Sequence, residues 1–573
     1  MKLRENLQIL STIFPSYIYL SISTYDKKLY VATALLILTF YLYKKYYFNL
    51  NNNTLTSDWS INRKVAIFSL FLFLILSQNR YLNIETITWD TSSYLVASNE
   101  IDRGFIPLRT QWESKGPLTM YIYYLISTFV NSNYVLFKLM NDIVLFLTLF
   151  ILLKKLDLID SNKNRHYFIC LFLLSTYSNR WFVSEFTEFY CLPIIAFANY
   201  LYLKKLKYHT LFIGICFGLS FLINQGSIIF FIPIILMTLI NSWDFKDLRK
   251  KIVSYFSGLL VPNFIFLVLY WSNGLIDVYL ANYIDIPLGY VGENMSSFYE
   301  LRVFLREIFY LNSFLYFAIV SFIFFFIASF FSKGKLHFDK LFTLINLNII
   351  ISLLYYFIAG HNFYHHLIYL IYFVSFLIIN INQHNQVKVI FLLIFLSSLN
   401  VATSTFQSSF KNLSNLTETY ENYPLKKLAE TIDDYFIDEN YSVLALDFVL
   451  VLHYLDTTNF SYIVHPTNHY QKYITDVLID LNKIEEDNIQ ALLNKRPDVI
   501  ICNTMSIDTG GKVMSTDPVN YGNDVEEGTE HFCSYGRYSD EYIQLDTESI
   551  RKDPNLNYYY DPYKEMNVFI KSQ

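Results

Sequence analysis

The sequence predicts an α-helical polytopic membrane protein with about 13 transmembrane helices, followed by a C-terminal extracytoplasmic α/β domain. Its 573 residues are 53% hydrophobic, 19% aromatic and only 16% charged, which is more apolar than a soluble globular protein. Apolar segments recur up to residue 406, and an ordinary soluble pattern follows over 407–573. Lysines and arginines gather in alternate connections, as in the cytoplasmic loops of membrane proteins.

The N-terminal part contains three predicted spans. Residues 7–23 follow a basic start, but no small-residue cleavage site comes after them, so we interpret them as a retained helix and not as a signal peptide. Residues 29–43 form the second span, and the lysines and arginines that follow place the next loop in the cytoplasm. The third span, 64–80, then leads outward. The N-terminus is therefore expected in the cytoplasm, and 81–133 is expected to be the first outer loop.

The apolar piece 120–130 decides the rest of the topology. It has about eleven residues where a span needs about twenty, so we expect a helix that begins at Pro117 and lies along the outer interface. The later segments then alternate across the bilayer, and all four later basic clusters fall inside. These segments are 134–153, 167–178, 189–203, 211–223, 228–240, 253–271, 308–331, 341–359, 366–379 and 389–401. The result is a multi-pass protein of the inner or plasma membrane whose C-terminal domain is extracytoplasmic.

The domain at 407–573 alternates helical and strand patterns. We expect helices at 425–435 and 484–494, and strands at 441–447, 460–464, 498–502 and 567–571. The polar stretch 506–537 is expected to be a long loop. With 5 cysteines the chain has no disulfide framework, yet Cys502 and Cys533 could pair if this domain is extracytoplasmic. The sequence leaves that pairing open.

Three polar outer loops carry the residues that could do chemistry. They contribute Asp90, Glu113 and Lys115; then Arg180, Glu185 and Glu188; then His361, His365 and His366. Carboxylates that share a cavity can accept a proton from an attacking hydroxyl or amine, or can hold a divalent cation against a phosphate. Nearby cationic groups suit binding that phosphate. No Rossmann glycine fingerprint and no P-loop occurs in the sequence, so nothing predicts a nucleotide site.

The first outer loop resembles a known family. Its order is Trp89-Asp90, Tyr94, Ala97, Gly104, Pro107 and then ESKGPL over 113–118. This order is similar to the first outer loop of the GT-C membrane glycosyltransferases, above all the polyprenyl-phosphate-sugar transferases related to protein O-mannosyltransferases and to the lipid A aminoarabinose transferase. Gly116 departs from that family, which has Lys-Pro-Pro-Leu there. Lys138 and Asn141 stand where the family has Arg and Asn, and His365-His366 stands where it has His-Tyr.

The resemblance implies a GT-C fold over 1–406 and an inverting transfer of a sugar from polyprenyl phosphate to an extracytoplasmic glycolipid, protein or cell-envelope polymer. Asp90 would be the catalytic base or a metal-side carboxylate. Glu113 and Lys115 would position the acceptor and the donor phosphate, with Glu185 or Glu188 assisting. Whether Mg²⁺ or Mn²⁺ is needed stays open, with Asp90 and Glu188 as its ligands if it is. The implied donor-phosphate and substrate-binding residues are Tyr94, Lys115, Lys138, Arg180, His361 and His365. The implied partners include the lipid bilayer and no nucleic acid.

Two alternatives remain open at this point. A polysaccharide polymerase or ligase could use the same polyprenyl-linked sugars, although such enzymes usually depend on a large outer loop late in the chain. A lipid-linked sugar flippase or transporter needs ionisable residues near the middle of several spans, whereas here they gather at the ends of the segments.

Overall fold

The structure is a computed structural model that describes 89–155, 185–242, 244–294, 340–358, 364–381, 420–437, 440–503, 540–551 and 566–572, with a few isolated residues between these ranges. Several predicted features lie outside the described residues. They are the spans at 7–23, 29–43, 64–80, 308–331 and 389–401, the domain boundary at 406–407, and the site residues Arg180 and His361.

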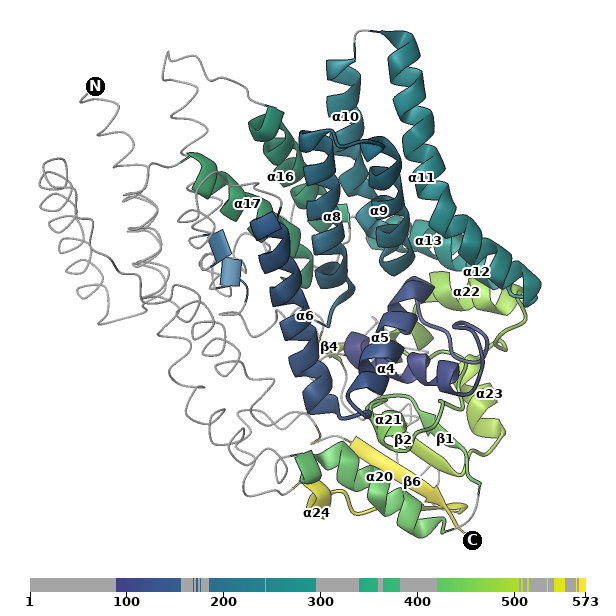
Figure 1. Cartoon of the computed structure of the whole chain (residues 1–573). Helices are drawn as coiled ribbons and strands as arrows, with labels where there is room; N and C mark the ends of the chain where they lie inside the picture. Colours follow the sequence, from purple (N-terminus) through teal and green to yellow (C-terminus); the bar gives the residue numbers. More distant parts are fainter. Residues whose placement is uncertain are drawn as a thin grey trace, which may run out of the picture.

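Long apolar helices form a bundle that occupies one side of the molecule (Figure 1). They are α6 (Tyr134–Lys155), α8 (Thr187–Lys204), α9 (His209–Ile223), α10 (Ile232–Asn241), α11 (Phe245–Ser272), α16 (Lys340–Ile358) and α17 (Ile368–Ile381), with the short 3-10 helices η2 (Gln225–Phe231) and η3 (Tyr364–Leu367) between them. Each coincides with an apolar segment that the sequence predicted. Helices α9 and α11 approach closely at Gly214, where a Cβ would lie 2.1 Å from the carbonyl oxygen of Tyr255.

One helix in the described part of the chain, α11, is long and apolar enough by itself to cross a membrane. Its 28 residues leave Phe256, Leu260 and Phe264 more than half exposed, which suits contact with lipid. The described residues also contain four shorter apolar helices, at 209–223, 225–241, 343–356 and 365–376. The total of about 13 spans stays a prediction.

The first outer loop contains two helices, α4 (Trp89–Asp102) and α5 (Pro117–Phe129). Helix α5 begins at Pro117 as predicted. Helix α4 was not predicted, and every residue from Thr91 to Glu100 in it is buried. Figure 1 shows why: α4 lies between the bundle and the C-terminal domain, so it is covered from both directions.

The C-terminal domain is built on a four-stranded sheet in the order β1-β2-β6-β5. β1 (Val443–Ala445) pairs in parallel with β2 (Val499–Asn503), and β6 (Met566–Lys571) is antiparallel to both β2 and β5 (Tyr542–Gln544). The helices around it are α20 (Pro424–Tyr435), α21 (Val451–Tyr454), α22 (Lys472–Asp480), α23 (Asn488–Asn494) and α24 (Glu548–Arg551), with the 3-10 helix η4 (Pro466–His469). A separate hairpin, β3 (Ile507–Asp508) and β4 (Val513–Met514), lies in the stretch predicted as a loop.

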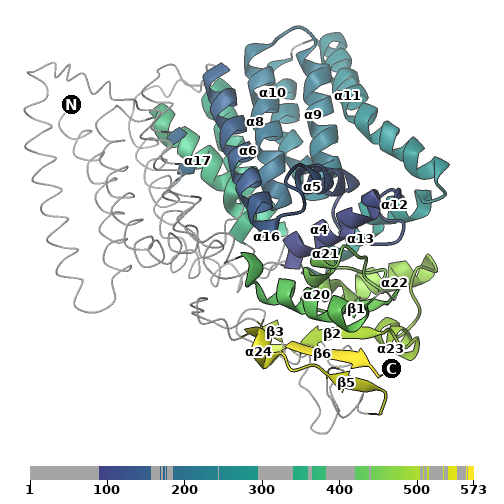
Figure 2. The same ribbon diagram turned by 60° about the horizontal axis from the view of Figure 1, so that its bottom comes forward.

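The predicted strand at 460–464 is wrong, because this segment does not join the sheet. Ile463 instead forms a parallel β-bridge with Trp112 of the first outer loop. The backbone N–H of Trp112 donates to the carbonyl of Tyr462 at 2.6 Å, and that of Val464 donates to the carbonyl of Trp112 at 3.2 Å. Figure 2 shows the result, with the bundle, the first outer loop and the C-terminal sheet stacked in succession.

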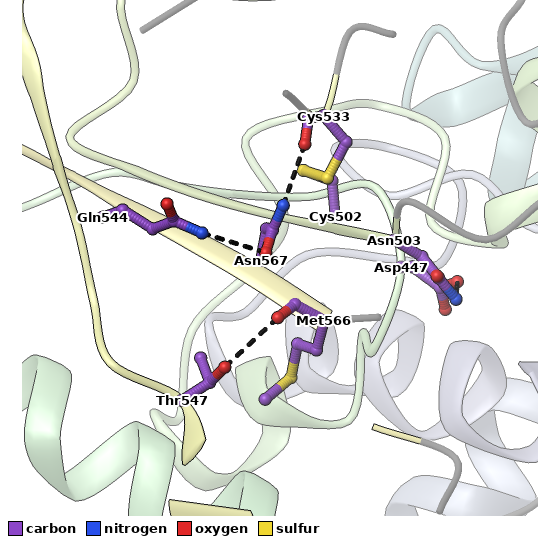
Figure 3. Close-up of a disulfide and its surroundings, with 8 residues drawn as sticks. All are labelled: Asp447, Cys502, Asn503, Cys533, Gln544, Thr547, Met566 and Asn567. Atoms are coloured by element: carbon purple, nitrogen blue, oxygen red, sulfur yellow. Dashed lines mark hydrogen bonds between the residues drawn. A yellow bond between two sulfur atoms is a disulfide. The ribbon is translucent and has the colours of Figure 1, made fainter. Parts of the chain in front are cut away.

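Cys502 at the end of β2 forms a disulfide with Cys533 (Figure 3). The side chain of Asn567 in β6 donates to the carbonyl of Cys533 at 3.0 Å, so Cys533 is tied to the two central strands of the sheet. The pairing that the sequence left open is therefore present. It is the pairing expected of an oxidising, extracytoplasmic compartment.

Candidate functional site

Asp90 lies in the first turn of α4 and its carboxylate has partners on two sides. The hydroxyl of Tyr94, one turn along, donates to Oδ1 at 3.1 Å. Nε2 of His465, from the C-terminal domain, lies 3.4 Å from the same oxygen. Burial alone would raise the pKa of Asp90, but His465, His365 and Lys115 outweigh it and hold this pKa well below its usual range. Asp90 is thus ionised at neutral pH, with 33% of its side chain still exposed.

Trp89 fixes the start of α4 to the C-terminal domain. Its indole Nε1 donates to Oδ1 of Asp447 at 3.0 Å. The other oxygen of Asp447 accepts from Asn503 at 3.1 Å, a pair that Figure 3 also shows. The side chain immediately before Asp90 is therefore held by a partly buried hydrogen-bond network that includes the C-terminal sheet.

Glu113 and Lys115 follow directly after the β-bridge of Trp112. Oε1 of Glu113 accepts from the N–H and the hydroxyl of Ser114, at 2.7 and 2.9 Å. Oε2 is buried and has no hydrogen-bond partner among the described residues. Burial and the negative charge of Asp90 raise the pKa of Glu113, against the opposing effect of His465. Glu113 therefore offers a buried, unused hydrogen-bonding oxygen beside Asp90.

The backbone of 114–116 is docked onto the helical bundle. Gln225 donates to the carbonyl of Ser114 at 2.9 Å, and Asn282 of α12 (Ile276–Tyr283) donates to the carbonyl of Lys115 at 3.2 Å. The N–H of Gly116 donates to Ile223 at the end of α9, at 3.2 Å. Three different elements thus hold the segment that carries Lys115.

Glu188 is the centre of a second buried group, at the start of α8. Its Oε1 accepts from Asn224 at 2.8 Å and from Tyr355 of α16 at 3.1 Å. Nε2 of His366 lies 3.5 Å from Oε1, and Nε2 of His365 lies 4.0 Å from Oε2. One ligand atom from each of these three residues lies within 4.8 Å of the others, which is the spacing of a metal-binding group.

Electrostatic interactions connect the groups around Asp90 and Glu188. Lys115 and His365 act on the carboxylates of both. The pKa of Tyr94 is raised well above its usual value, first by burial and then by the charges of Asp90, Glu113 and Glu188. The structure thus brings together acids and bases from three predicted outer loops.

Two predicted residues lie in a different environment. Lys138 of α6 is buried, with its ammonium 4.5 Å from the ring centre of Tyr134. The Glu185 carbonyl accepts from the Tyr123 hydroxyl, and its carboxylate acts on Tyr123 and Tyr190. No described contact places Lys138 or Glu185 against Asp90.

Sequence reasoning missed two aromatic residues of the site. His465 comes directly after the predicted strand 460–464, and the contact of that segment with the first outer loop, including the bridge between Trp112 and Ile463, brings it to Asp90. Tyr290 of α13 (Asp285–Asn294) is acted on by the charges of Asp90 and Glu188, and its ring packs at 6.0 Å against Tyr473 of the C-terminal domain.

No family model and no curated protein matches the sequence. Among solved structures, the chain is similar to ArnT from Cupriavidus metallidurans bound to undecaprenyl phosphate, with 10% identity and a TM-score of 0.42 over 78% of this chain and 93% of that one. It is also similar to the Archaeoglobus fulgidus oligosaccharyltransferase in complex with zinc and sulfate, with 13% identity and a TM-score of 0.32 over 76% of this chain and 68% of that one.

Proposed function

We propose that this chain is an integral-membrane glycosyltransferase of the GT-C type. It transfers a sugar from a polyprenyl-phosphate donor to an extracytoplasmic acceptor, which is a glycolipid, a protein or a cell-envelope polymer. The observation that carries the proposal is the pair of carboxylates at Asp90 and Glu188, with Lys115 acting on both. An inverting transfer needs an ionised carboxylate, here Asp90, to accept a proton. It also needs a nearby cation, here Lys115, to balance the charge on the phosphate.

Asp90 is the proposed general base. Its lowered pKa keeps it ionised at neutral pH, so its oxygens carry no proton, and its partly exposed carboxylate leaves room for an acceptor. The acceptor oxygen or nitrogen attacks the anomeric carbon of the sugar and its proton passes to Asp90. The bond from that carbon to the phosphate oxygen breaks, and polyprenyl phosphate leaves with the electron pair. Lys115 balances the negative charge that grows on the phosphate.

The group of Glu188, His365 and His366 is a better candidate site for a divalent cation than a site made of carboxylates alone. Two imidazole nitrogens and one carboxylate form a ligand set typical of Zn²⁺, whereas Mg²⁺ prefers oxygen ligands. Asp90 and Glu188 do not form a joint metal-binding group in the described residues. A bound cation would supply Lewis acidity toward a phosphate oxygen, and Lys115 would act on the same phosphate.

The test uses purified full-length protein in lipid nanodiscs with a radiolabelled polyprenyl-phosphate monosaccharide and membrane extract as the acceptor source. We expect wild type to transfer label. The Asp90→Asn variant should have a transfer rate lower by at least about a thousandfold, which is the scale for removal of a catalytic base. Asp102→Asn is the matched control, because Asp102 ends the same helix and is exposed. Undiminished transfer by a folded Asp90→Asn variant would exclude the proposed base.

The two alternatives predict different products in the same assay. A polymerase or ligase would give products that lengthen with time or label on a preformed polymer, whereas a transferase attaches one sugar per acceptor. A flippase would move labelled lipid between leaflets and leave its sugar–phosphate bond intact. Recovery of unlabelled polyprenyl phosphate in a ratio of one to each transferred sugar supports the transferase.

A further inference from the structure

We propose that the C-terminal domain supplies a positioning residue for the reaction, His465, which holds the Asp90 carboxylate in place. This inference rests on the proposed function, because it assigns His465 to the group that acts as the base. Nε2 of His465 lies 3.4 Å from Oδ1 of Asp90, and the Tyr94 hydroxyl donates to that same oxygen at 3.1 Å. Oδ1 is thus fixed from two domains, which leaves Oδ2 to meet an acceptor.

The His465 ring is itself held in one orientation. The backbone N–H of Thr467 lies 3.3 Å from Nδ1, and an N–H can only donate, so Nδ1 is the accepting nitrogen. The proton of the neutral ring is then on Nε2, the nitrogen that faces Asp90. His465 therefore donates toward the carboxylate even when it is uncharged.

The position of His465 is set by the contact between the two domains. Two residues before it, Ile463 forms the β-bridge with Trp112. The side chain of Gln111 donates to the carbonyl of Asn459 at 3.0 Å and accepts from its N–H at 2.8 Å. The ring of His465 packs edge-on against Trp89 with centroids 6.5 Å apart. Asp90 and His465 are each attached to the same buried junction, so their contact does not depend on a mobile side chain.

Several charged groups face His465 and decide how it behaves with pH. Burial lowers the pKa of His465, but hydrogen bonding to Asp90 and the charges of Asp90 and Glu113 outweigh it, so the pKa is raised. Lys115 opposes that effect. Two further titratable groups interact with His465 from within its own domain, Asp447 and His469. Loss of His465 would remove the donor nearest to Asp90, so the pKa of Asp90 would rise.

The experiment compares His465→Ala, His465→Gln and wild type as full-length proteins in the transfer assay, across pH. We expect His465→Ala to lower kcat roughly tenfold or more with little change in the KM for the donor, because the contact that holds the base in place is lost. The acid limb of the pH–kcat profile of this variant should move to higher pH, because the Asp90 carboxylate is then protonated more easily. His465→Gln should recover part of kcat, because its amide nitrogen can reach the place of Nε2.

His453→Gln is the matched control. His453 is a buried histidine of α21 in the same domain, and its Nε2 lies 2.9 Å from the carbonyl oxygen of Ser132, so it contacts the first outer loop away from Asp90. This control variant should change neither the acid limb of the pH–kcat profile nor kcat/KM. A His465→Ala variant with the kcat and acid limb of wild type would overturn the inference and leave the transferase proposal intact.

A second measurement separates the two proposals if wild type transfers no sugar. Thermal unfolding of Asp90→Ala, His465→Ala and the double variant forms a double-mutant cycle, since alanine at either position removes the contact. Non-additive shifts in the unfolding midpoint support the fixed contact between these side chains. Additive shifts overturn it, whatever the assay reports on sugar transfer.

Discussion

Trp112 and Ile463 form a parallel β-bridge that joins the first outer loop to the C-terminal domain. Both side chains are fully buried, in one cluster with Tyr270 of α11 and Leu478 of α22. Glu113 comes one residue after Trp112, and His465 comes two residues after Ile463. A single backbone contact thus sets the spacing between the acidic loop and the histidine that faces Asp90, and the two domains form the candidate site together.

The Glu113 carboxylate should lower the stability of the folded protein at neutral pH while it contributes to sugar transfer. Burial raises its pKa, so the folded state binds the proton more tightly than the unfolded chain does. Its effect on stability is then most favourable below the ordinary glutamate pKa and is lost as pH rises through the raised value. We expect Glu113→Gln to raise the free energy of unfolding at pH 7 by about 1 kcal/mol, because a buried charge without full compensation is removed. The same change should lower sugar transfer.

Thermal unfolding at pH 4 and pH 7 provides the measurement for Glu113→Gln. The gain in the variant should be largest at pH 7 and should vanish at pH 4, where the wild-type side chain is protonated. Glu485→Gln is the control, because 61% of the Glu485 side chain is exposed. A destabilised Glu113→Gln at pH 7 would mean that the ionised carboxylate contributes to folding.

Much of the bundle could be predicted because its physical signal is local. The predicted apolar segments became α6, α8 and α9 within two residues of the expected ends, whereas α11 begins at Phe245, eight residues before the predicted segment 253–271. The sequence of helix α4 gave no such signal, because the contacts that stabilise this helix come from residues far from it in the sequence or involve a buried charged side chain. Its buried Glu100 accepts hydrogen bonds from the backbone of Arg109, Thr110 and Gln111, which makes a charged residue acceptable inside.

The site was predictable only where the loops carry their own motif. Asp90, Glu113, Lys115 and Glu188 could be named from residue type and topology. The proximity of Asp90 to His465 could not, because it depends on a bridge between segments far apart in the sequence. The segment around Ile463 has the alternation of a strand, but its partner is Trp112 and not the neighbouring sheet. A pattern of alternation does not specify the partner.

Gly116 should not tolerate the proline that the resembling family has at this place. A Cβ there would lie 2.0 Å from the carbonyl oxygen of Leu222, and proline would also remove the N–H that donates to Ile223. We expect Gly116→Pro to cost more than about 2 kcal/mol of stability, since backbone atoms must move apart. Gly116→Ala should cost less, because it keeps the hydrogen bond. Equal unfolding midpoints for Gly116→Pro and wild type would contradict this packing.

The group of Glu188, His365 and His366 should bind zinc. After dialysis against zinc and gel filtration, we expect about one Zn²⁺ per chain by elemental analysis, as for a site with three protein ligands. Glu188→Gln and His366→Ala should each lower the zinc content by at least about tenfold, whereas His209→Ala, at the start of α9, should not. Zinc content unchanged in Glu188→Gln would contradict the assignment, whatever the activity.

The disulfide between Cys502 and Cys533 makes a prediction about both location and stability. The sequence has 5 cysteines, so protein isolated from cells and unfolded without a reductant should expose two fewer thiols than the reduced protein. We expect Cys502→Ser to lose about 3 kcal/mol of stability in the C-terminal domain, because the bridge closes a loop of 31 residues in the unfolded chain. Cys216→Ser is the control, since Cys216 is a free, buried thiol of α9.

Thiol labelling with a maleimide polymer counts the cysteines on a gel. Equal labelling with and without reductant would show that the domain is not exposed to an oxidising compartment, and it would contradict the extracytoplasmic placement on which the outer site depends.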